Sequence, residues 1–206
     1  MGYGYDYGFW FAVVIYSGIT LMFVVGFIRP RRRREWKSMG VVGAFFVSLF
    51  TEMFGFPLTI YTLTSVFGFN MPVLNPYAHE SGHMLASFGL GVEMAALFCQ
   101  LGSLIFYLGM LIIGIGWWQI HRGDGELVTG GIYRFIRHPQ YLGMFLLTTG
   151  MMIQWPTIPT LIMWPILLIN YYRLSQREDN ELIDEFGDEY EEYRQKTPAF
   201  LPLKLS

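Results

Sequence analysis

Long apolar stretches separated by short polar intervals dominate the chain. Four of them are uncharged or nearly so: residues 9–28, 40–69, 94–118 and 141–172. The first and the last contain no Asp, Glu, Lys, Arg or His. Because apolar runs of about 18 residues or more are typical of helices that cross a bilayer, the pattern predicts an all-α, polytopic membrane helix bundle.

The composition agrees with this prediction. Of the 206 residues, 53% are hydrophobic and 15% are charged, whereas soluble globular domains contain about 25% charged residues. An ordinary soluble protein is therefore excluded, and a nucleic-acid partner is not expected. We expect one membrane domain over residues 1–206, with membrane lipids and a lipophilic small molecule as partners.

The basic residues predict the orientation of the bundle. All 14 Lys and Arg residues lie in three intervals: six in residues 29–37, three in 122–137 and five in 173–204. Since positive charge near helix ends marks the cytoplasmic side, the N-terminus is expected outside and the C-terminus in the cytosol.

This orientation requires the last apolar stretch to cross the membrane twice. Its 32 residues would form a single helix of about 48 Å, well beyond a hydrocarbon core of about 30 Å. We expect a helical hairpin that turns at Gln154, Trp155, Pro156 and Thr157, because proline ends a preceding helix. The total is then about five transmembrane helices. The second arm should continue past Tyr172 as a cytosolic amphipathic helix.

The interval before the hairpin, residues 125–143, is a candidate anion site. It is rich in glycine, so backbone amides can approach a ligand closely, and Pro139 suits the first turn of a helix. The helix N-terminus would attract a carboxylate or a phosphate, with Arg137 and His138 as further donors. The alternative is a basic loop that anchors the helix at the lipid headgroups.

The tail over residues 173–193 has helical periodicity and carries Glu178 and Asp179 near its start. Acidic groups so close to the membrane could accept hydrogen bonds from an ammonium group or a ribose. The alternative is a solvated helix face without a function.

Residues 79–83, HESGH, match the HExxH pattern of zinc hydrolases. They lie in a loop expected outside that also contains Pro72 and Pro76, Gly82 weakens a helix there, and only Glu93 is nearby as a further acid. We therefore expect no catalytic metal site here and favour a structural or metal-contact role for the two histidines. The single cysteine, Cys99, is interpreted as a packing residue.

Two motifs, GGIYRFIRHPQYLG before the hairpin and REDNELIDEFGDEYEEYRQKTPAFLP after it, closely resemble the superfamily of isoprenylcysteine carboxyl methyltransferases and phospholipid N-methyltransferases. The resemblance covers residues 112–202 and implies that this is the catalytic half. Residues 1–110 resemble that half only in being helical, and we expect them to serve substrate access or specificity.

The resemblance implies an S-adenosyl-L-methionine site at the cytoplasmic membrane face. The cofactor carboxylate would lie near Arg137, His138 and the helix N-terminus, and Glu178 would face the amino group or another donor. The positions implied as cofactor-binding are Gly114, Gly116, Gly125, Glu126, Leu127, Val128, Tyr133, Arg137, His138, Pro139, Gln140, Tyr141, Glu178 and Asp179.

The methyl acceptor is expected to be membrane-soluble: a lipid amine, a thiol or a prenylcysteine carboxylate. An amine or a thiol must lose a proton, for which Tyr133, His138 and Glu52 are the candidate catalytic acceptors. Glu52 is an acid within an apolar stretch, a frequent sign of function, although a packing role is equally compatible. Prenylcysteine methyltransferases carry an arginine four residues before the glutamate, where this chain has Leu174. Arg173 is the nearby candidate for substrate binding, rotated by about 100° around the helix.

Two other functional classes remain open on the sequence alone. One is a non-enzymatic membrane protein that binds lipid or a partner. The other is an outward-facing metal hydrolase built on residues 79–83.

Overall fold

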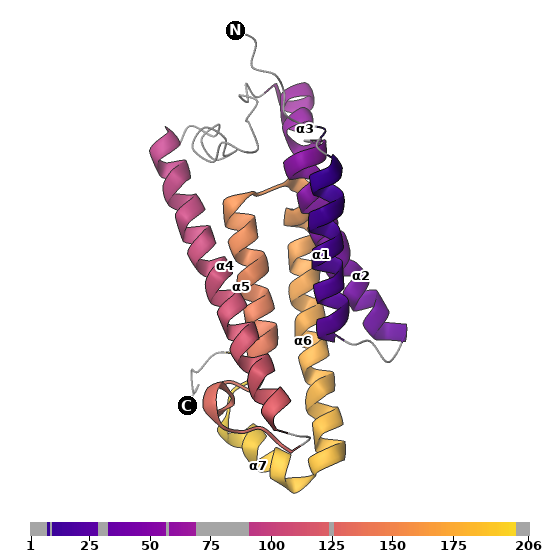
Figure 1. The fold of residues 1–206 in the computed structure, drawn as a ribbon, viewed down its shortest axis with the longest axis vertical. Helices are drawn as coiled ribbons and strands as arrows, with labels where there is room; N and C mark the ends of the chain where they lie inside the picture. Colours follow the sequence, from indigo (N-terminus) through magenta and orange to yellow (C-terminus); the bar gives the residue numbers. More distant parts are fainter. Residues whose placement is uncertain are drawn as a thin grey trace. The chain divides into compact units, whose positions relative to one another are not determined.

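The computed structural model describes residues 8, 10–28, 33–56, 58–68, 91–123 and 126–200. Within these ranges all regular structure is helical, which confirms the all-α prediction (Figure 1). The elements are α1 (Trp10–Ile28), α2 (Arg33–Phe50), the π-helical turn η1 (Thr51–Gly55), α3 (Leu58–Phe67), α4 (Gly91–Arg122), the 3-10 helix η3 (Gly131–Arg134), α5 (Pro139–Gln154), α6 (Ile158–Phe186) and α7 (Asp188–Lys196).

The second apolar stretch is broken into two helical parts. The pair Gly40–Gly55 and Leu58–Phe67 is bent by 72°. Phe56, between them, has an extended backbone with φ −124° and ψ 116°. The physical reason is in the sequence: Phe56 precedes a proline, and the proline ring disfavours the helical conformation in the residue before it.

The predicted hairpin turn is confirmed. α5 ends at Gln154 and α6 begins at Ile158. Thr157 caps the new helix, because its Oγ1 accepts a hydrogen bond from the Thr160 backbone amide at 3.2 Å. α6 then runs without interruption past Tyr172 to Phe186, as predicted.

The tail is not one helix, however. Gly187 has a positive φ of 57° and separates α6 from α7. Glycine adopts this left-handed conformation at little cost, whereas other residues are disfavoured there. The break redirects the chain, so that α7 returns toward the second half of α6 (Figure 1).

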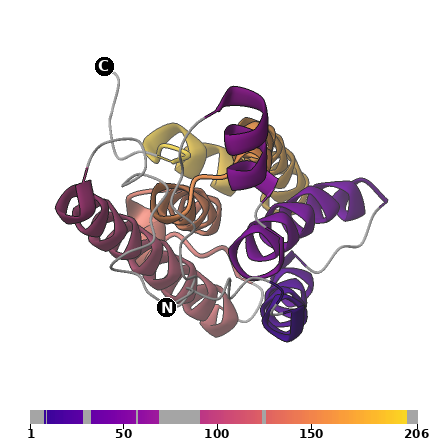
Figure 2. The ribbon, with the colours of Figure 1, turned by 90° about the horizontal axis from the view of Figure 1, so that it is seen from above.

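The chain forms two compact units. The first consists of Met1–Ser103 and Met151–Leu167, and the second of Leu104–Gly150 and Leu168–Ser206. In the first unit α1 lies beside α2 (Figure 2), and the Tyr16 ring lies 5.7 Å from that of Phe50 and 5.4 Å from that of Phe54.

The second unit contains a close contact between α4 and α5. A Cβ atom added to Gly109 would lie 2.6 Å from the carbonyl oxygen of Gly143, and one added to Gly143 would lie 2.8 Å from that of Gly109. Glycine on both helices therefore lets the two backbones touch, an arrangement common between membrane helices.

By length and hydropathy, one described segment, Ala96–Arg122, is suited to cross a membrane by itself. The bent pair formed by α2 and α3 would be a second if it is counted as one span. The bundle of about five transmembrane helices and its orientation stay predictions.

Candidate active site

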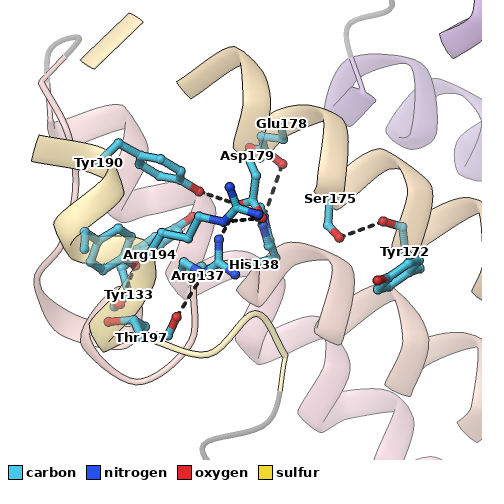
Figure 3. A network of polar contacts seen from close by, with 11 residues as sticks. Tyr133, Arg137, His138, Tyr172, Ser175, Glu178, Asp179, Tyr190, Arg194 and Thr197 are labelled. Atoms are coloured by element: carbon cyan, nitrogen blue, oxygen red, sulfur yellow. Dashed lines mark hydrogen bonds and ion pairs between the residues drawn. The ribbon is translucent and has the colours of Figure 1, made fainter. Parts of the chain in front are cut away.

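A cluster of buried polar side chains lies in the second unit, where the start of α5, the second half of α6 and α7 meet (Figure 3). Its centre is Asp179, whose side chain is 0% exposed. The Oδ1 atom of Asp179 accepts three hydrogen bonds: from Arg137 Nη1 at 2.6 Å, His138 Nε2 at 2.8 Å and Tyr190 Oη at 2.5 Å. The cluster therefore joins segments separated by about forty residues in sequence.

Asp179 and His138 each stabilise the charged form of the other. Burial alone would raise the pKa of Asp179, but its hydrogen bonds to His138 and Tyr190 and the charges of His138 and Arg137 lower the pKa to about 2. Burial alone would lower the pKa of His138, and the hydrogen bonds and charges of Asp179 and Glu178 outweigh burial and raise it. Asp179 is thus an anion at neutral pH, and the protonated form of His138 is favoured.

Glu178 is the outward-facing member of the cluster. Its side chain is 37% exposed, and its Oε2 lies 3.5 Å from Nδ1 of His138. The other carboxylate oxygen of Asp179, Oδ2, is buried and accepts no hydrogen bond within the described part of the chain; Nε of Arg194 lies 4.0 Å from it. The site is therefore rich in acceptor oxygens.

The segment after α7, residues 197–200, which we call the strap, closes over the start of α5. The carbonyl oxygens of Pro198 and Ala199 accept hydrogen bonds from the backbone amides of Arg137 and His138, at 2.9 and 3.1 Å. The Thr197 carbonyl accepts another from Nε of Arg137 at 2.9 Å. These donors, which the sequence suggested for a ligand carboxylate, are used within the protein.

Tyr133 is buried in η3 and contacts α4 and α7. Its Oη lies 3.4 Å from the Gly116 carbonyl oxygen, and its own carbonyl accepts a hydrogen bond from Tyr193 Oη at 2.5 Å. Burial raises the pKa of the Tyr133 phenol, and the nearby Glu178 and Tyr193 raise it further. At neutral pH the phenol keeps its proton, which disfavours Tyr133 as a general base.

The two glycines of α4 that the resemblance singled out have different surroundings. A Cβ on Gly116 would lie 3.2 Å from Pro139 Cγ and 3.4 Å from Tyr133 Oη, so this glycine makes room for α5 and η3. A Cβ on Gly114 would have no other atom within 4 Å among the described residues. Gly114 is exposed and lies two residues before the buried Gly116, so the two glycines are on different faces of α4.

The remaining predicted positions differ in burial. Pro139 and Gln140 are buried in the first turn of α5, and the Tyr141 ring lies 5.7 Å from that of His138. Glu126, Leu127 and Val128 precede η3 and are exposed or half-buried. Arg173 is exposed on α6. Gly125 and residues 79–83 lie outside the described residues.

Glu52 lies in the first unit, apart from the residues just described. Its carboxylate accepts hydrogen bonds from Thr59, from the backbone amide at 3.0 Å and from the hydroxyl at 3.0 Å. The same Thr59 hydroxyl accepts a hydrogen bond from the Ile158 amide at 2.9 Å. These contacts give Glu52 a structural role, because its carboxylate satisfies donors at the start of α3, next to the hairpin turn.

Sequence reasoning missed several residues of the cluster. Tyr190 and Tyr193 belong to the EYEEY motif, and their contacts with Asp179 and with the Tyr133 carbonyl are seen only in the structure. The strap carried no such signal, because two of its contacts run from backbone to backbone.

Comparison with known proteins covers the part of the site on α5 and α6, including Arg137, His138 and Asp179, and ends before Tyr190. A family model for phospholipid methyltransferases matches residues 91–189. The chain is similar to protein-S-isoprenylcysteine O-methyltransferase of Schizosaccharomyces pombe, with 37% identity over 83 residues, 39% of this chain and 34% of the relative. The Xenopus laevis protein of that name is 36% identical over 94 residues, which are 41% of this chain and 30% of the relative. The Homo sapiens protein is 32% identical over 78 residues, which are 37% of this chain and 28% of the relative.

The chain thus spans about a third of the length of these curated relatives. No solved structure matches it at a significant level.

Proposed function

We propose that the chain is an integral membrane methyltransferase, because a family model for phospholipid methyltransferases matches residues 91–189, in the superfamily that the motifs predicted. It transfers a methyl group from S-adenosyl-L-methionine to a membrane-soluble acceptor. The observation that carries the proposal is the cluster around Asp179, which joins the two ends of the hairpin and leaves the carboxylate of Glu178 partly exposed.

The chemistry of this cluster fits the amino end of the cofactor. When bound, S-adenosyl-L-methionine supplies an electrophilic methyl group on a sulfonium ion. The Glu178 carboxylate accepts hydrogen bonds from an ammonium group, and Asp179 Oδ2 adds a second, deeper acceptor.

Arg137 and His138 are positioning residues in this proposal. Arg137 donates one hydrogen bond from Nη1 to Asp179 and another from Nε to the Thr197 carbonyl oxygen. His138 donates Nε2–H to Asp179 and directs Nδ1 toward Glu178. The pair thereby fixes the direction of the Glu178 carboxylate and joins the two ends of the hairpin.

The proton question depends on the acceptor. A carboxylate acceptor has no proton to lose, and alignment together with exclusion of water is sufficient. An amine or a thiol must release one, and the carboxylate of Glu178 is the acceptor at the partly exposed edge of the cluster. The contacts of Glu52 with Thr59 favour a packing role for that residue.

The class of acceptor is the part of the proposal with two candidates. The relatives are named as methyltransferases of S-isoprenylcysteine, which favours a prenylcysteine carboxylate. Against it stands Leu174, at the position where the resemblance implies an arginine; Arg173 is one residue earlier and exposed. A lipid amine or a thiol is therefore the second candidate.

The proposal also covers the orientation of the chain and the roles of its two halves. We propose that the N-terminus lies outside and that the C-terminus and the cofactor site lie in the cytosol. Residues 1–110 would serve access or specificity for the acceptor, and residues 112–202 would form the catalytic half.

The test is a methyl-transfer assay with the purified full chain in nanodiscs. Methyl-labelled S-adenosyl-L-methionine is added together with N-acetyl-S-farnesylcysteine or with phosphatidylethanolamine, and label in the lipid extract is counted. Label in either acceptor supports the enzyme and identifies its class. If calorimetry shows cofactor binding but neither acceptor is labelled, methyl transfer to these two acceptors is contradicted. If the cofactor does not bind, the result favours a non-enzymatic lipid-binding protein.

A further inference from the structure

An open apolar groove of about 620 Å³ lies on the surface of α4, within the second unit. Every residue that lines it belongs to this helix: Tyr107, Met110, Leu111, Gly114, Ile115 and Trp118. Gly114 forms a recess, because a Cβ added there would have no other described atom within 4 Å. The other side chains are exposed and carry no charge, so the groove suits a hydrocarbon chain.

A guanidinium group lies at one end of this groove. Cζ of Arg122 is 4.0 Å from the centre of the Trp118 ring, which lines the groove. Stacking on an aromatic ring uses the flat face of a guanidinium, so the N–H groups around its edge stay available to a phosphate. The Arg122 side chain is exposed, and within the described part of the chain no carboxylate forms an ion pair with it.

A second aromatic and basic pair lies next to the first. The His121 ring is 4.1 Å from the Trp117 ring, and both side chains are exposed. Tryptophan is enriched at the interface between membrane and water, and basic side chains there attract anionic headgroups. The C-terminal end of α4 therefore has the composition of a helix end that faces lipid headgroups.

The length of the groove matches one leaflet of a bilayer. Eleven residues separate Tyr107 from Trp118, which is about 16 Å along a helix at 1.5 Å per residue. Half of a hydrocarbon core of about 30 Å is about 15 Å. Positions 107, 111, 114, 118 and 122 follow one another at intervals of three or four residues and share one side of the helix. A hydrocarbon chain that lies in the groove therefore ends at Arg122.

We propose that this face of α4 binds one anionic phospholipid of the cytosolic leaflet. An acyl chain lies in the groove, and the phosphate contacts the edge of the Arg122 guanidinium. This lipid is neither the cofactor nor the methyl acceptor, and its site is separate from the cluster around Asp179. The assignment rests on the proposed placement of α4 in the membrane and not on methyl transfer.

The charges at the end of α4 decide which phospholipid binds. The C-terminal end of a helix carries a partial negative charge, which disfavours a phosphate. Arg122 must therefore supply most of the attraction. A zwitterionic headgroup brings its own cation, which competes with Arg122 for the phosphate, so an anionic headgroup gains more from this residue.

The test is native mass spectrometry of the purified full chain in mild detergent, titrated with palmitoyl-oleoyl phosphatidylglycerol or phosphatidylcholine. We expect one saturable phosphatidylglycerol adduct, with about tenfold higher affinity than the phosphatidylcholine adduct. Arg122→Gln should lower the phosphatidylglycerol affinity about tenfold, the size of effect expected for a charge-assisted hydrogen bond, and should leave phosphatidylcholine nearly unchanged. Lys196→Gln removes one positive charge from an exposed position on α7 and should change neither affinity.

A matched pair of variants on α4 tests the groove itself. Leu111 lines the groove, whereas Leu108, which is also exposed, does not. Leu111→Ala should weaken the binding of both lipids about threefold, because part of the apolar contact with the chain is lost. Leu108→Ala should leave both affinities unchanged. Thermal melts verify that all the variants are folded.

A lack of saturable adduct, equal affinity of the wild type for the two lipids, or equal losses in Arg122→Gln and Lys196→Gln would each overturn the anionic-lipid site. Equal affinities in Leu111→Ala and Leu108→Ala would overturn the position of the chain in the groove. Displacement of phosphatidylglycerol by S-adenosyl-L-methionine would assign the groove to the cofactor instead. Methyl transfer is measured in a separate assay, so failure of the lipid site and failure of the proposed function are distinguishable.

Discussion

Asp179 holds the candidate active site together at the scale of single residues. Its buried carboxylate satisfies Arg137, His138 and Tyr190 through one oxygen atom. Two of these partners are cationic or readily protonated, so removing the anion would leave buried positive charge without compensation. That situation is much more costly than the loss of a neutral hydrogen bond.

We therefore expect Asp179→Asn to lower the free energy of unfolding by about 3 kcal/mol. Thermal unfolding in detergent measures the change. Asp184→Asn is the matched control, since Asp184 is exposed on the same helix. Equal melting temperatures for the two variants would show that the cluster contributes little to stability.

The pH dependence of stability has a defined sign. The raised pKa of His138 means that its contribution is complete below its ordinary value of 6.5 and is lost as the pH rises through the raised value. The lowered pKa of Asp179 means that its contribution is present above its ordinary value of 3.8 and is lost as the pH falls toward about 2. Melting temperatures of the wild type should therefore fall on the alkaline side, and His138→Gln should remove that part of the decline. Parallel profiles of the two proteins would contradict this assignment.

For Glu178, the affinity for the cofactor is a more direct measurement than thermal stability. A hydrogen bond to a charged group contributes about 1.5–3 kcal/mol, so Glu178→Ala should weaken the affinity for S-adenosyl-L-methionine by about tenfold to a hundredfold. Calorimetric titration measures the Kd directly. Glu185→Ala, an exposed position two turns further along α6, should keep the wild-type Kd. Unchanged affinity in Glu178→Ala would remove this residue from the site.

At the scale of elements, the sequence predicted what depends on local chemistry. The turn of the hairpin follows from Pro156 within a long apolar stretch, and the structure has it at that place. The break after Phe56 and the break at Gly187 were both signalled by a proline or a glycine, but neither was predicted. The position of the strap could not be predicted from the sequence, because its hydrogen bonds to the amides of Arg137 and His138 use backbone atoms, which every residue type possesses.

The contact between α4 and α5 gives a prediction at this scale. Gly109→Ala would place its Cβ 2.6 Å from the Gly143 carbonyl oxygen, so the helices must separate and the free energy of unfolding should fall by about 1–3 kcal/mol. Gly114→Ala, on the same helix, meets open space and should preserve or slightly increase stability, because alanine favours helix formation. Thermal melts of the two variants compare them directly.

Cofactor binding to the same pair separates packing from ligand contact. If the open backbone at Gly114 receives the cofactor, Gly114→Ala should weaken binding while its melting temperature stays at or above that of the wild type. Wild-type affinity in Gly114→Ala would mean that the cofactor lies elsewhere. A stable Gly109→Ala variant would contradict the close contact itself.

At the scale of the whole molecule, orientation in the membrane decides whether the candidate active site can meet a cytosolic cofactor. Basic residues occur in three intervals only, and their distribution predicts that α7 lies in the cytosol and that residues 70–90 lie outside. The site on α5, α6 and α7 would then be cytosolic.

Cysteine labelling in intact cells tests this orientation. In a Cys99→Ser background, Ser81→Cys should react with a membrane-impermeant thiol reagent, because its loop is expected outside. Gln195→Cys, at an exposed position on α7, should react only after the cells are permeabilised. The reverse pattern would place α7 outside and separate the Glu178 carboxylate from the cytosolic pool of S-adenosyl-L-methionine, so the proposed function would fail together with the orientation.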